Sequence, residues 1–518
     1  MNPRKFCNHR IIARAAFAVE IEKRHFAKRL GDADTPLKSE IIPFGGDKIF
    51  WTDADLNLHP FIALLGRDGG CDDPAALIRA DLGGFACANH LTREQVHHGV
   101  ADKPRHECGI GPLVEIKRRT DLRNTATRAE NGTLACDHLN RWEDDLDRIR
   151  DLGADIYRFS LSWARIMPEG RGAVNEAGLD FYDRLIDGML ARGLRPAATL
   201  YHWELPLALA DQGGWVNGDM PNWFADYTEI VMARLGDRLW SVAPINEPWS
   251  VSWLSHFEGH HAPGLRDIRA AARAMHHVLS SHGRAIEVMR ARGMRNLGAV
   301  CNFEAALPAD ESPASKAAAA RYDAIYNQFF LSGLFHGHYP DLVLEGLEQH
   351  LPQNYQDDFA HITAPLDWLG LNYYTCKRLS AGCGIWPNYQ GVEGPLPKTQ
   401  MGWEIYPEGL HHFLTHTAKT YTGDLPLYVT ENGMANDDTP EQPDVARITY
   451  LDAHMRACLR AIEDGAPLKG YIAWSLMDNY EWAFGYEKRF GLVHVDFDSL
   501  QRRPKASYHA LAQGWRAG

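Results

Sequence analysis

The chain lacks a surplus of positive charge and lacks long apolar runs. Its 54 lysines and arginines are outnumbered by 67 aspartates and glutamates, which gives a net charge of −13. Such a chain is repelled by the phosphates of nucleic acids and by anionic lipid headgroups. No run approaches the roughly 20 apolar residues that a membrane-spanning helix needs, and the stretch 11–21 is broken by Arg14 and Glu20. We therefore expect no nucleic acid and no membrane among its partners, and no secretory signal.

The nine cysteines show no CxxC spacing, and no group of side chains has the spacing of zinc ligands. The histidine pairs 97–98 and 276–277 are adjacent in the chain, so the two side chains of each pair point in different directions. No glycine-rich phosphate loop is present either. An odd number of cysteines without a framework is typical of reduced thiols in a cytoplasmic protein. We expect a cytoplasmic location, no metal and no cofactor.

From about residue 135 onward, short apolar segments rich in β-branched and aromatic residues alternate with helical patterns. Several of these segments are too uniformly apolar for a sheet with one wet face, which is typical of strands buried on both faces. The predicted strands are 155–163, 196–203, 240–247, 296–303, 367–375, 426–431 and 468–476.

Between these strands the apolar residues recur with helical spacing. Residues 176–193 place six of them on one stripe, and Asn175 and Gly193 are suited to begin and end that helix. The stripe consists of Leu179, Tyr182, Leu185, Ile186, Met189 and Leu190. Further helices are predicted at 137–152, 222–235, 267–292 and 447–463. Repeated strand–helix alternation implies a parallel sheet, and seven strands with long crossovers predict an α/β (β/α)8 TIM barrel whose first strand is still to be found.

The N-terminal quarter of the chain follows no such pattern. Residues 24–131 show no sustained period of 2 or 3.6. So long a stretch without regular structure is unusual inside a compact domain. We interpret residues 1–131 as an atypical N-terminal segment, either an insertion, a poorly ordered segment or a region of altered reading frame. Residues 132–518 form the barrel domain.

The functional groups of a parallel barrel gather at the carboxyl ends of its strands. Here those ends are polar and aromatic, and two of them carry a glutamate, which indicates a carbohydrate site. The residues at the strand ends are Arg158, His202-Trp203, Asn246-Glu247, Asn372-Tyr373-Tyr374, Glu431-Asn432 and Trp474. The alternative reading is that the two glutamates form salt bridges at the rim.

Cleavage of a glycosidic bond with retention of configuration needs two carboxyl groups with opposite tasks. One stays protonated until it protonates the leaving oxygen, and the other attacks the anomeric carbon as a carboxylate. Their environments must therefore separate their pKa values. Arg158 and the Tyr374 hydroxyl are suited to hold Glu431 ionised, and Glu247 is followed by Pro248 and Trp249, whose apolar surroundings favour a protonated acid.

From about Cys136 to the C-terminus the chain resembles glycoside hydrolase family one, the β-glucosidase family. The resemblance rests on several motifs in order: ACDH (135–138), YRFSLSWARIMPEG (157–170), YHWELP (201–206), INEPW (245–249), GLNYYT (370–375), MGWEIYPEGL (401–410), YVTENG (428–433) and WSLMDNYEWAFGYEKRFGLVHVD (474–496). It implies a retaining β-glucosidase acting on small β-glucosides or cello-oligosaccharides in cellulose degradation. Glu247 is then the acid/base and Glu431 the nucleophile.

The resemblance also assigns the remaining site residues. Arg158 and Tyr374 orient the nucleophile. The residues implied to bind substrate are His202, Trp203, Asn246, Asn372, Tyr374, Trp403, Trp474, Glu481, Trp482 and Phe490. For Trp403 and Phe490, packing is an alternative role.

The N-terminus departs from the family, whose first strand ends in a sugar-binding glutamine. The nearest match is AAFAVEIEK, with Glu20 at the glutamine position, so residues 13–22 are the candidate for the first strand. Three further possibilities stay open: a catalytically impaired sugar-binding or interaction protein on the same barrel, activity on β-galactosides or β-fucosides, and transglycosylation. The sequence also leaves room for a homo-oligomer.

Overall fold

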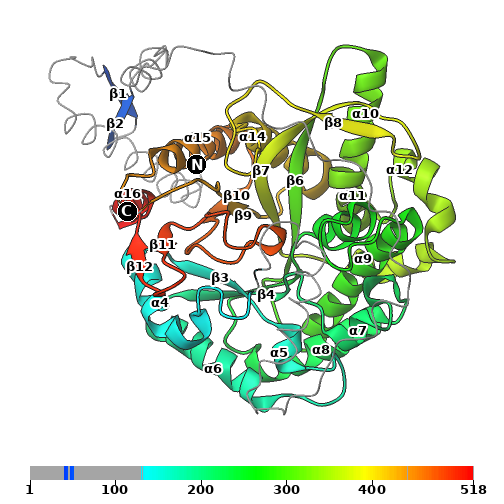
Figure 1. Cartoon of the computed structure of the whole chain (residues 1–518), viewed down its shortest axis with the longest axis horizontal. Coiled ribbons are helices and arrows are strands. Elements are labelled where there is room, and N and C mark those ends of the chain that lie inside the picture. Colours follow the sequence, from blue (N-terminus) through cyan, green and yellow to red (C-terminus); the bar gives the residue numbers. More distant parts are fainter. Residues whose placement is uncertain (1–39, 45–46, 52–129, 131, 440, 517–518) are drawn as a thin grey trace. The chain divides into compact units, whose positions relative to one another are not determined.

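The computed structural model describes residues 40–44, 47–51, 130, 132–439 and 441–516, and Figure 1 shows strands at the centre of the main unit with helices around them. Among the described residues, seven strands form one parallel row, and each coincides with a predicted strand. In spatial order they are β3 (Ile156–Ser160), β4 (Arg195–Tyr201), β5 (Ser241–Ile245), β6 (Gly298–Pro308), β7 (Trp368–Ala381), β9 (Leu427–Asn432) and β10 (Leu468–Ala473). The predicted (β/α)8 TIM barrel is confirmed.

Neighbouring strands in this row run parallel throughout. Between β5 and β6 the pairing is reduced to two bridges, Val242–Leu297 and Asn246–Val300. Every residue of β5 is buried, and in β4 only Arg195 is exposed. Burial on both faces explains why these segments do not alternate between apolar and polar residues. The parallel direction brings the carboxyl ends of all seven strands to one edge.

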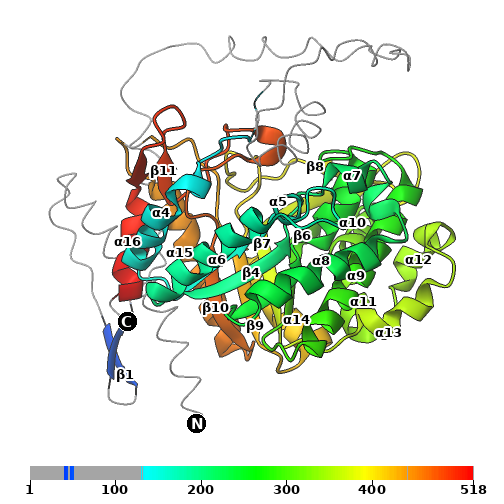
Figure 2. The same ribbon diagram turned by 90° about the horizontal axis from the view of Figure 1, so that it is seen from below.

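Helices cover the outside of the barrel, and Figure 2 shows α6, α8 and α9 along one side of it. The apolar core fills the space between strands and helices. The helices are α4 (His138–Leu152), α5 (Trp163–Ile166), α6 (Glu176–Ala191), α7 (Leu207–Ala210), α8 (Met220–Leu235), α9 (Ile268–Ala291), α10 (Pro313–Asp323), α11 (Phe329–His336), α12 (Asp341–Leu347), α13 (Phe359–Ile362), α14 (Pro407–Thr417), α15 (Val445–Glu463) and α16 (Ala506–Arg516).

The five predicted helices are present, with two corrections on α6. Asn175 precedes the helix but does not cap it, because its amide donates to the carbonyl of Arg165 at 2.9 Å. Leu190 is 44% exposed, since the buried stripe ends at Met189. Gly193, just past the helix, has a left-handed φ of 74°, as a chain reversal requires.

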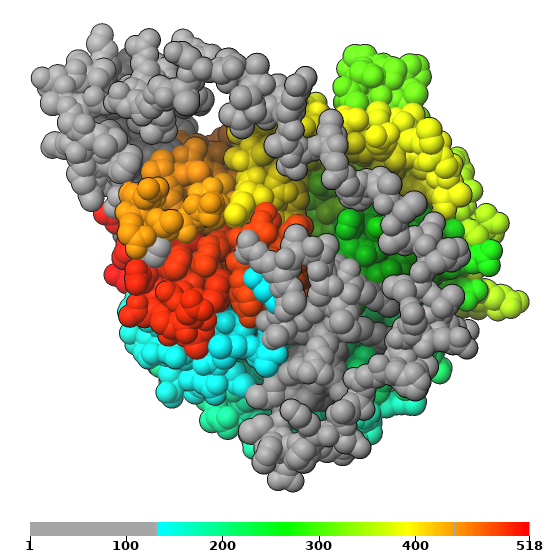
Figure 3. Space-filling view, viewed as in Figure 1, coloured from blue at the N-terminus to red at the C-terminus, as the bar shows by residue number. Residues whose placement is uncertain are grey.

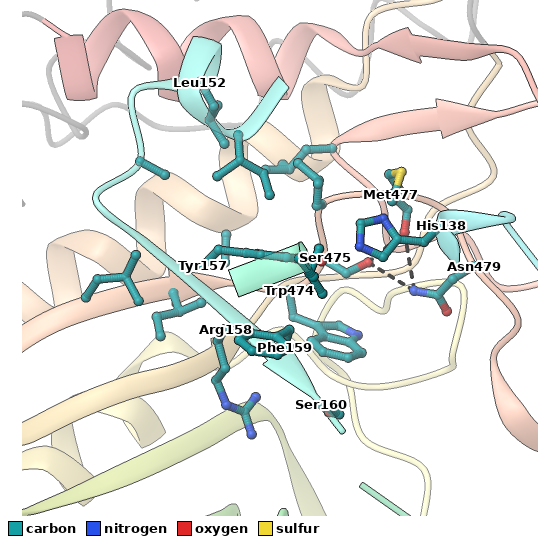
Figure 4. A pocket seen from close by; sticks show the side chains of 18 of the residues that line it. His138, Leu152, Tyr157, Arg158, Phe159, Ser160, Trp474, Ser475, Met477 and Asn479 are labelled. Carbon is teal, nitrogen blue, oxygen red and sulfur yellow. Dashed lines mark hydrogen bonds between the residues drawn. The ribbon is translucent and has the colours of Figure 1, made fainter. Parts of the chain in front are cut away.

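The wall of the barrel has a seam between β3 and β10. In the described part of the chain, no strand pairs with β3 on the side away from β4, or with β10 on the side away from β9. A cavity of about 1230 Å³ lies there, lined by both strands and by part of α4. Figure 4 shows this lining, including Tyr157, Phe159 and Trp474. The candidate first strand, 13–22, lies outside the described residues.

Beside the seam, the C-terminal residues pack on α4, seen in Figure 3 as red against cyan. The Tyr508 hydroxyl donates to the carbonyl of Arg148 at 2.6 Å. The guanidinium of Arg502 pairs with the fully buried Asp145 at 3.0 Å. The two ends of the barrel domain are thus fastened to each other through side chains.

Among the described residues, three further strand pairings lie outside the row. Strand β8 (Tyr389–Val392) extends β7 antiparallel, and β11 (Val493–Val495) pairs with β12 (Arg502–Pro504). In the N-terminal unit, β1 (Glu40–Phe44) and β2 (Asp47–Trp51) form an antiparallel hairpin. Both strands lie within residues 24–131, where the sequence shows no sustained period.

Candidate active site

Two glutamates lie at the carboxyl ends of two strands of the row. Glu247 is the second residue after β5, and Glu431 is the penultimate residue of β9. Their exposed fractions are only 6% and 3%. An ionised carboxyl group is costly to bury unless it is paired, so the partners of each glutamate decide what it can do.

Glu431 is held by one cation and one hydroxyl. Arg158 Nη1, from β3, donates to Glu431 Oε1 at 2.6 Å, and the Tyr374 hydroxyl, from β7, donates to Oε2 at 2.7 Å. Both oxygens therefore have a donor from another strand. The Arg158 guanidinium thus places a positive charge directly beside the Glu431 carboxyl group.

Glu247 has a different environment. Its oxygens accept hydrogen bonds from the Ser250 hydroxyl and the Asn372 amide, each at 2.8 Å, and no cation binds it directly in the described structure. Burial, followed by the nearby charge of Glu431, raises the pKa of Glu247 to about 8. Its backbone has a left-handed φ of 52°, a strained conformation that is typical of functional positions.

A chain of amides links the two glutamates. Asn246 Oδ1 accepts from Arg158 Nη2 at 2.6 Å and from Asn372 Nδ2 at 3.0 Å. Asn372, in turn, is oriented by the Thr430 hydroxyl, which donates to its Oδ1 at 2.7 Å. Thr430, next to Glu431 in the chain, orients Asn372, which donates to Glu247. Asn246, next to Glu247, binds Arg158, which donates to Glu431. The neighbour of each glutamate in the chain therefore contacts a partner of the other glutamate.

His202 extends this network from the end of β4. Its Nε2 lies 3.3 Å from Asn246 Nδ2, and its ring stacks at 5.7 Å on Trp474, which follows β10. Burial, and then the charge of Arg158, lowers the pKa of His202 to about 3. A neutral imidazole therefore lies beside Asn246 and Trp474 at all physiological pH values.

Aromatic rings form two walls. On one side Trp203 lies 5.4 Å from Trp482 and donates its indole N–H to the Asn246 carbonyl at 3.1 Å. On the other side Tyr374 contacts Trp403 and Phe490, with centroids 5.5 and 6.1 Å apart. Apolar ring faces of this kind suit the C–H surface of a sugar.

Glu481 is half-buried in the segment that follows β10. Burial, followed by the charges of Glu431 and Glu247, raises its pKa to about 8. The charges of both proposed catalytic glutamates therefore act on Glu481. The structure brings together every residue predicted for the site, and their individual roles stay predictions.

Sequence reasoning missed two residues. Ser250 donates to Glu247 from a π-helical stretch, Ser250–Glu258, and the signal was its position three residues after Glu247. The ring of His261 lies 5.1 Å from that of Trp203, and no sequence signal pointed to it. The seam cavity is lined in part by Arg158 and Trp474, and neither Glu247 nor Glu431 is among its described lining residues.

None of the described helices combines the length and the apolar character needed to cross a bilayer. In the same part of the chain, no three histidine, cysteine or acidic side chains come together as metal ligands.

The model of glycosyl hydrolase family 1 matches residues 117–513. Beta-glucosidase A of Thermotoga maritima is 44% identical over 385 residues, which cover 73% of this chain and 86% of that protein. A bifunctional beta-D-glucosidase/beta-D-fucosidase of Bifidobacterium breve is 39% identical over 406 residues, covering 73% and 87%. The solved beta-glucosidase from Thermotoga maritima in complex with deoxynojirimycin superposes with a TM-score of 0.74 at 41% identity, covering 77% of this chain and 92% of that one.

Proposed function

Because this chain belongs to glycosyl hydrolase family 1, we propose that it is a retaining β-glucosidase that uses Glu431 as nucleophile and Glu247 as acid/base. The observation that carries the proposal is the contrast between the two buried glutamates. Glu431 is paired with Arg158 at 2.6 Å, whereas the pKa of Glu247 is raised to about 8. One carboxylate and one carboxylic acid are the two forms that the first step requires.

In that step Glu431 attacks the anomeric carbon while the Glu247 proton moves to the departing glycosidic oxygen. The alcohol leaves, and an ester joins the sugar to Glu431. Glu247, now ionised, takes a proton from water, whose oxygen attacks the anomeric carbon and releases Glu431. Two inversions give net retention, and an acceptor alcohol in place of water gives transglycosylation.

The surrounding groups are proposed to hold the sugar. The Asn246 amide, anchored at its oxygen by Arg158, is directed to the 2-hydroxyl, and neutral His202 to the 3-hydroxyl. Trp474 stacks on the ring. Glu481 and Trp482 bind the 3-, 4- and 6-hydroxyls. Asn372 and Trp203 support this set. Trp403 lines the entrance where the leaving group sits, and Phe490, whose ring lies 6.3 Å from that of Trp403, closes the floor of the pocket.

The proposed substrates are small β-glucosides and cello-oligosaccharides, which places the enzyme in cellulose degradation. The Bifidobacterium breve relative, named for two activities, supports a test of β-fucosides as well. We keep a cytoplasmic location as a proposal, because Cys301, Cys376 and Cys458 are buried free thiols, a state that a reducing compartment preserves. Cell fractionation tests the location, and light scattering tests for a homo-oligomer.

The decisive assay compares the wild type with Glu431→Gly on an aryl β-glucoside. We expect the variant to lose about four orders of magnitude in kcat or more, and azide to restore leaving-group release with an α-glycosyl azide as product. A folded wild type that releases nothing would favour the alternative, a sugar-binding protein on the same barrel.

We also propose that residues 13–22 supply the strand that completes the barrel at the seam. The support is the pair of strand edges, β3 and β10, on either side of one cavity. Deletion of residues 1–24 tests this: the melting temperature and activity should fall, and a synthetic peptide 11–24 should restore them in part where a scrambled peptide does not. An unchanged melting temperature on deletion would rule the strand assignment out.

A further inference from the structure

The sugar-binding segment 474–490 carries Trp474, Glu481, Trp482 and Phe490 but contains little regular structure. Its single helical turn in the structure is Trp482–Phe484. A loop of this length is mobile unless other contacts fix it. The start and the middle of the segment are fixed in different ways.

The start of the segment is fixed by the strand that carries Glu431. The Trp474 N–H donates to the Asn432 carbonyl at 2.9 Å. At the next position, a Cβ on Gly433 would lie 1.8 Å from the Trp474 carbonyl oxygen, so only glycine permits this approach. Trp474 is therefore placed by backbone contacts with β9.

The middle of the segment is fixed by a buried carboxylate instead. Asp478, three residues before Glu481, has no exposed surface. It accepts hydrogen bonds from the Gly491 and Val495 amides at 2.9 and 3.3 Å. It also pairs with Arg489 at 2.9 Å and with Lys505 at 3.0 Å.

Lys505 connects this carboxylate to a second loop. Its ammonium group also lies 3.1 Å from Asp438, in the loop that follows the nucleophile strand. Asp438 pairs with Arg447 of α15, which in turn pairs with Asp444 at 2.5 Å and donates to the carbonyl of Arg489 at 2.8 Å. Three carboxylates and three cations thus balance in one network. Its members are Asp438, Asp444, Asp478, Arg447, Arg489 and Lys505.

Burying so many charges is a poor way to gain stability, because desolvation offsets most of their attraction. What such a network can supply is one fixed geometry, since each group is satisfied in only one arrangement. Arg447 and Lys505 both contact the two loops, and Lys505 is the member that pairs with a carboxylate of each, Asp438 and Asp478. Its own main-chain N–H is fixed by the Leu492 carbonyl at 2.9 Å.

We propose that Lys505 is a positioning residue that fixes Glu481 and Trp482 relative to the nucleophile by clamping Asp478 to Asp438. The inference rests on the proposed function, and it assigns to Lys505 no contact with the sugar. The sugar-binding residues of the segment are then placed in two ways. Trp474 is placed by β9, whereas Glu481 and Trp482, which are directed to the 6-hydroxyl, are placed by the network.

The test measures kcat/KM for an aryl β-glucoside and for its 6-deoxy analogue, which differ by one hydroxyl group. We expect Lys505→Met to lower kcat/KM about tenfold for the glucoside and by a smaller factor, about threefold, for the 6-deoxy substrate, which keeps its 3- and 4-hydroxyls but cannot lose the 6-hydroxyl contact. In a Glu481→Gln background the effect of Lys505→Met should largely vanish, because the group through which it acts is gone.

The matched control is Arg238→Met, which removes a cation paired with Asp183 and Asp187 on the helical surface, far in the chain from the segment. Arg238→Met should lower the melting temperature without changing the ratio of the kcat/KM values for the two substrates. Equal losses of Lys505→Met on both substrates, or effects that add to those of Glu481→Gln, would overturn the proposal.

A second variant covers the case in which Lys505→Met does not fold. The pair Asp438→Asn with Lys505→Met removes one charge of each sign, so it should recover much of the melting temperature while keeping the altered substrate ratio. If the ratio of the two kcat/KM values also returned to that of the wild type, the proposed role of Lys505 would be contradicted.

Binding of deoxynojirimycin, measured by calorimetry, separates failure of this inference from failure of the proposed function. If the wild type binds deoxynojirimycin but does not cleave glucosides, only the proposed hydrolase activity is contradicted. Weaker binding by Lys505→Met than by Arg238→Met then supports the positioning role of Lys505. Equal binding by the two variants overturns it. A wild type that neither cleaves nor binds contradicts both proposals.

Discussion

Arg158 Nη1 lies 2.6 Å from Glu431 Oε1, although 273 positions separate the two residues in the chain. The second Nη of the same guanidinium is bound to Asn246, at the residue preceding Glu247. One side chain of β3 thereby contacts both the proposed nucleophile and the amide directed to the sugar.

Replacement of Arg158 by methionine should therefore lower kcat by about two to three orders of magnitude, because a buried carboxylate loses its cation. Arg158→Lys keeps the charge but not the two-pronged contact, so its kcat should lie between those of Arg158→Met and the wild type. Steady-state kinetics on an aryl β-glucoside checks both variants. If kcat falls less than about twofold in Arg158→Met, the Tyr374 hydroxyl alone is sufficient to keep Glu431 active as the nucleophile.

The pH dependence should reflect Glu247. Its pKa is raised to about 8, so the acid is protonated below that value and kcat/KM should fall as the pH rises through it. The pKa of Glu481 is also raised to about 8, and its ionisation would add to the same limb. The profile of Glu481→Gln separates the two groups. If the basic limb disappears in this variant, it belongs to Glu481 and not to Glu247.

The basic limb should move when Ser250 is changed. Its hydroxyl donates to Glu247 Oε2 at 2.8 Å and stabilises the ionised form, which lowers the pKa of Glu247. Ser250→Ala removes that effect, so the pKa should rise and the basic limb should shift to higher pH. Ser252→Ala is the control, since that hydroxyl donates to the Pro248 carbonyl instead. A shift to lower pH in Ser250→Ala would refute the assignment.

Gly433→Ala should be damaging despite adding one methyl group. The new Cβ would lie 1.8 Å from the Trp474 carbonyl oxygen, which forces the backbone after the nucleophile strand away from the sugar-binding segment. We expect a loss of about 3 kcal/mol in the free energy of unfolding, together with a rise in KM. Thermal unfolding and kinetics measure these two effects. Gly465→Ala, at a position with open space but a left-handed φ of 96°, separates steric contact from backbone strain.

Much of the barrel could be predicted because its strands are short and buried on both faces. Segments such as 240–247 read as strands from their apolar character alone, and β5 lies within that range. The helix 176–193 followed from its stripe, but Leu190 was assigned to the wrong face. A periodic pattern gives the orientation of a helix only to within one residue at its ends.

The candidate site could be predicted because strand order fixes which chain positions meet. Glu247, Glu431 and Arg158 all lie at or near strand ends, and a parallel barrel gathers those ends on one edge. Ser250 and His261 were missed, since neither lies on a strand and their contacts depend on how the segment after β5 folds back.

The sequence by itself determined the period of each element and the residue types at each strand end, and hence the barrel and the two glutamates. These are local properties, set by backbone geometry and by which side chains avoid water. The tertiary structure alone decided the different environments of Glu247 and Glu431, because a pKa depends on burial and on charges that are close only after folding. It also decided that Lys505 joins Asp438 and Asp478, since no local pattern encodes a contact among three segments so far apart in the chain.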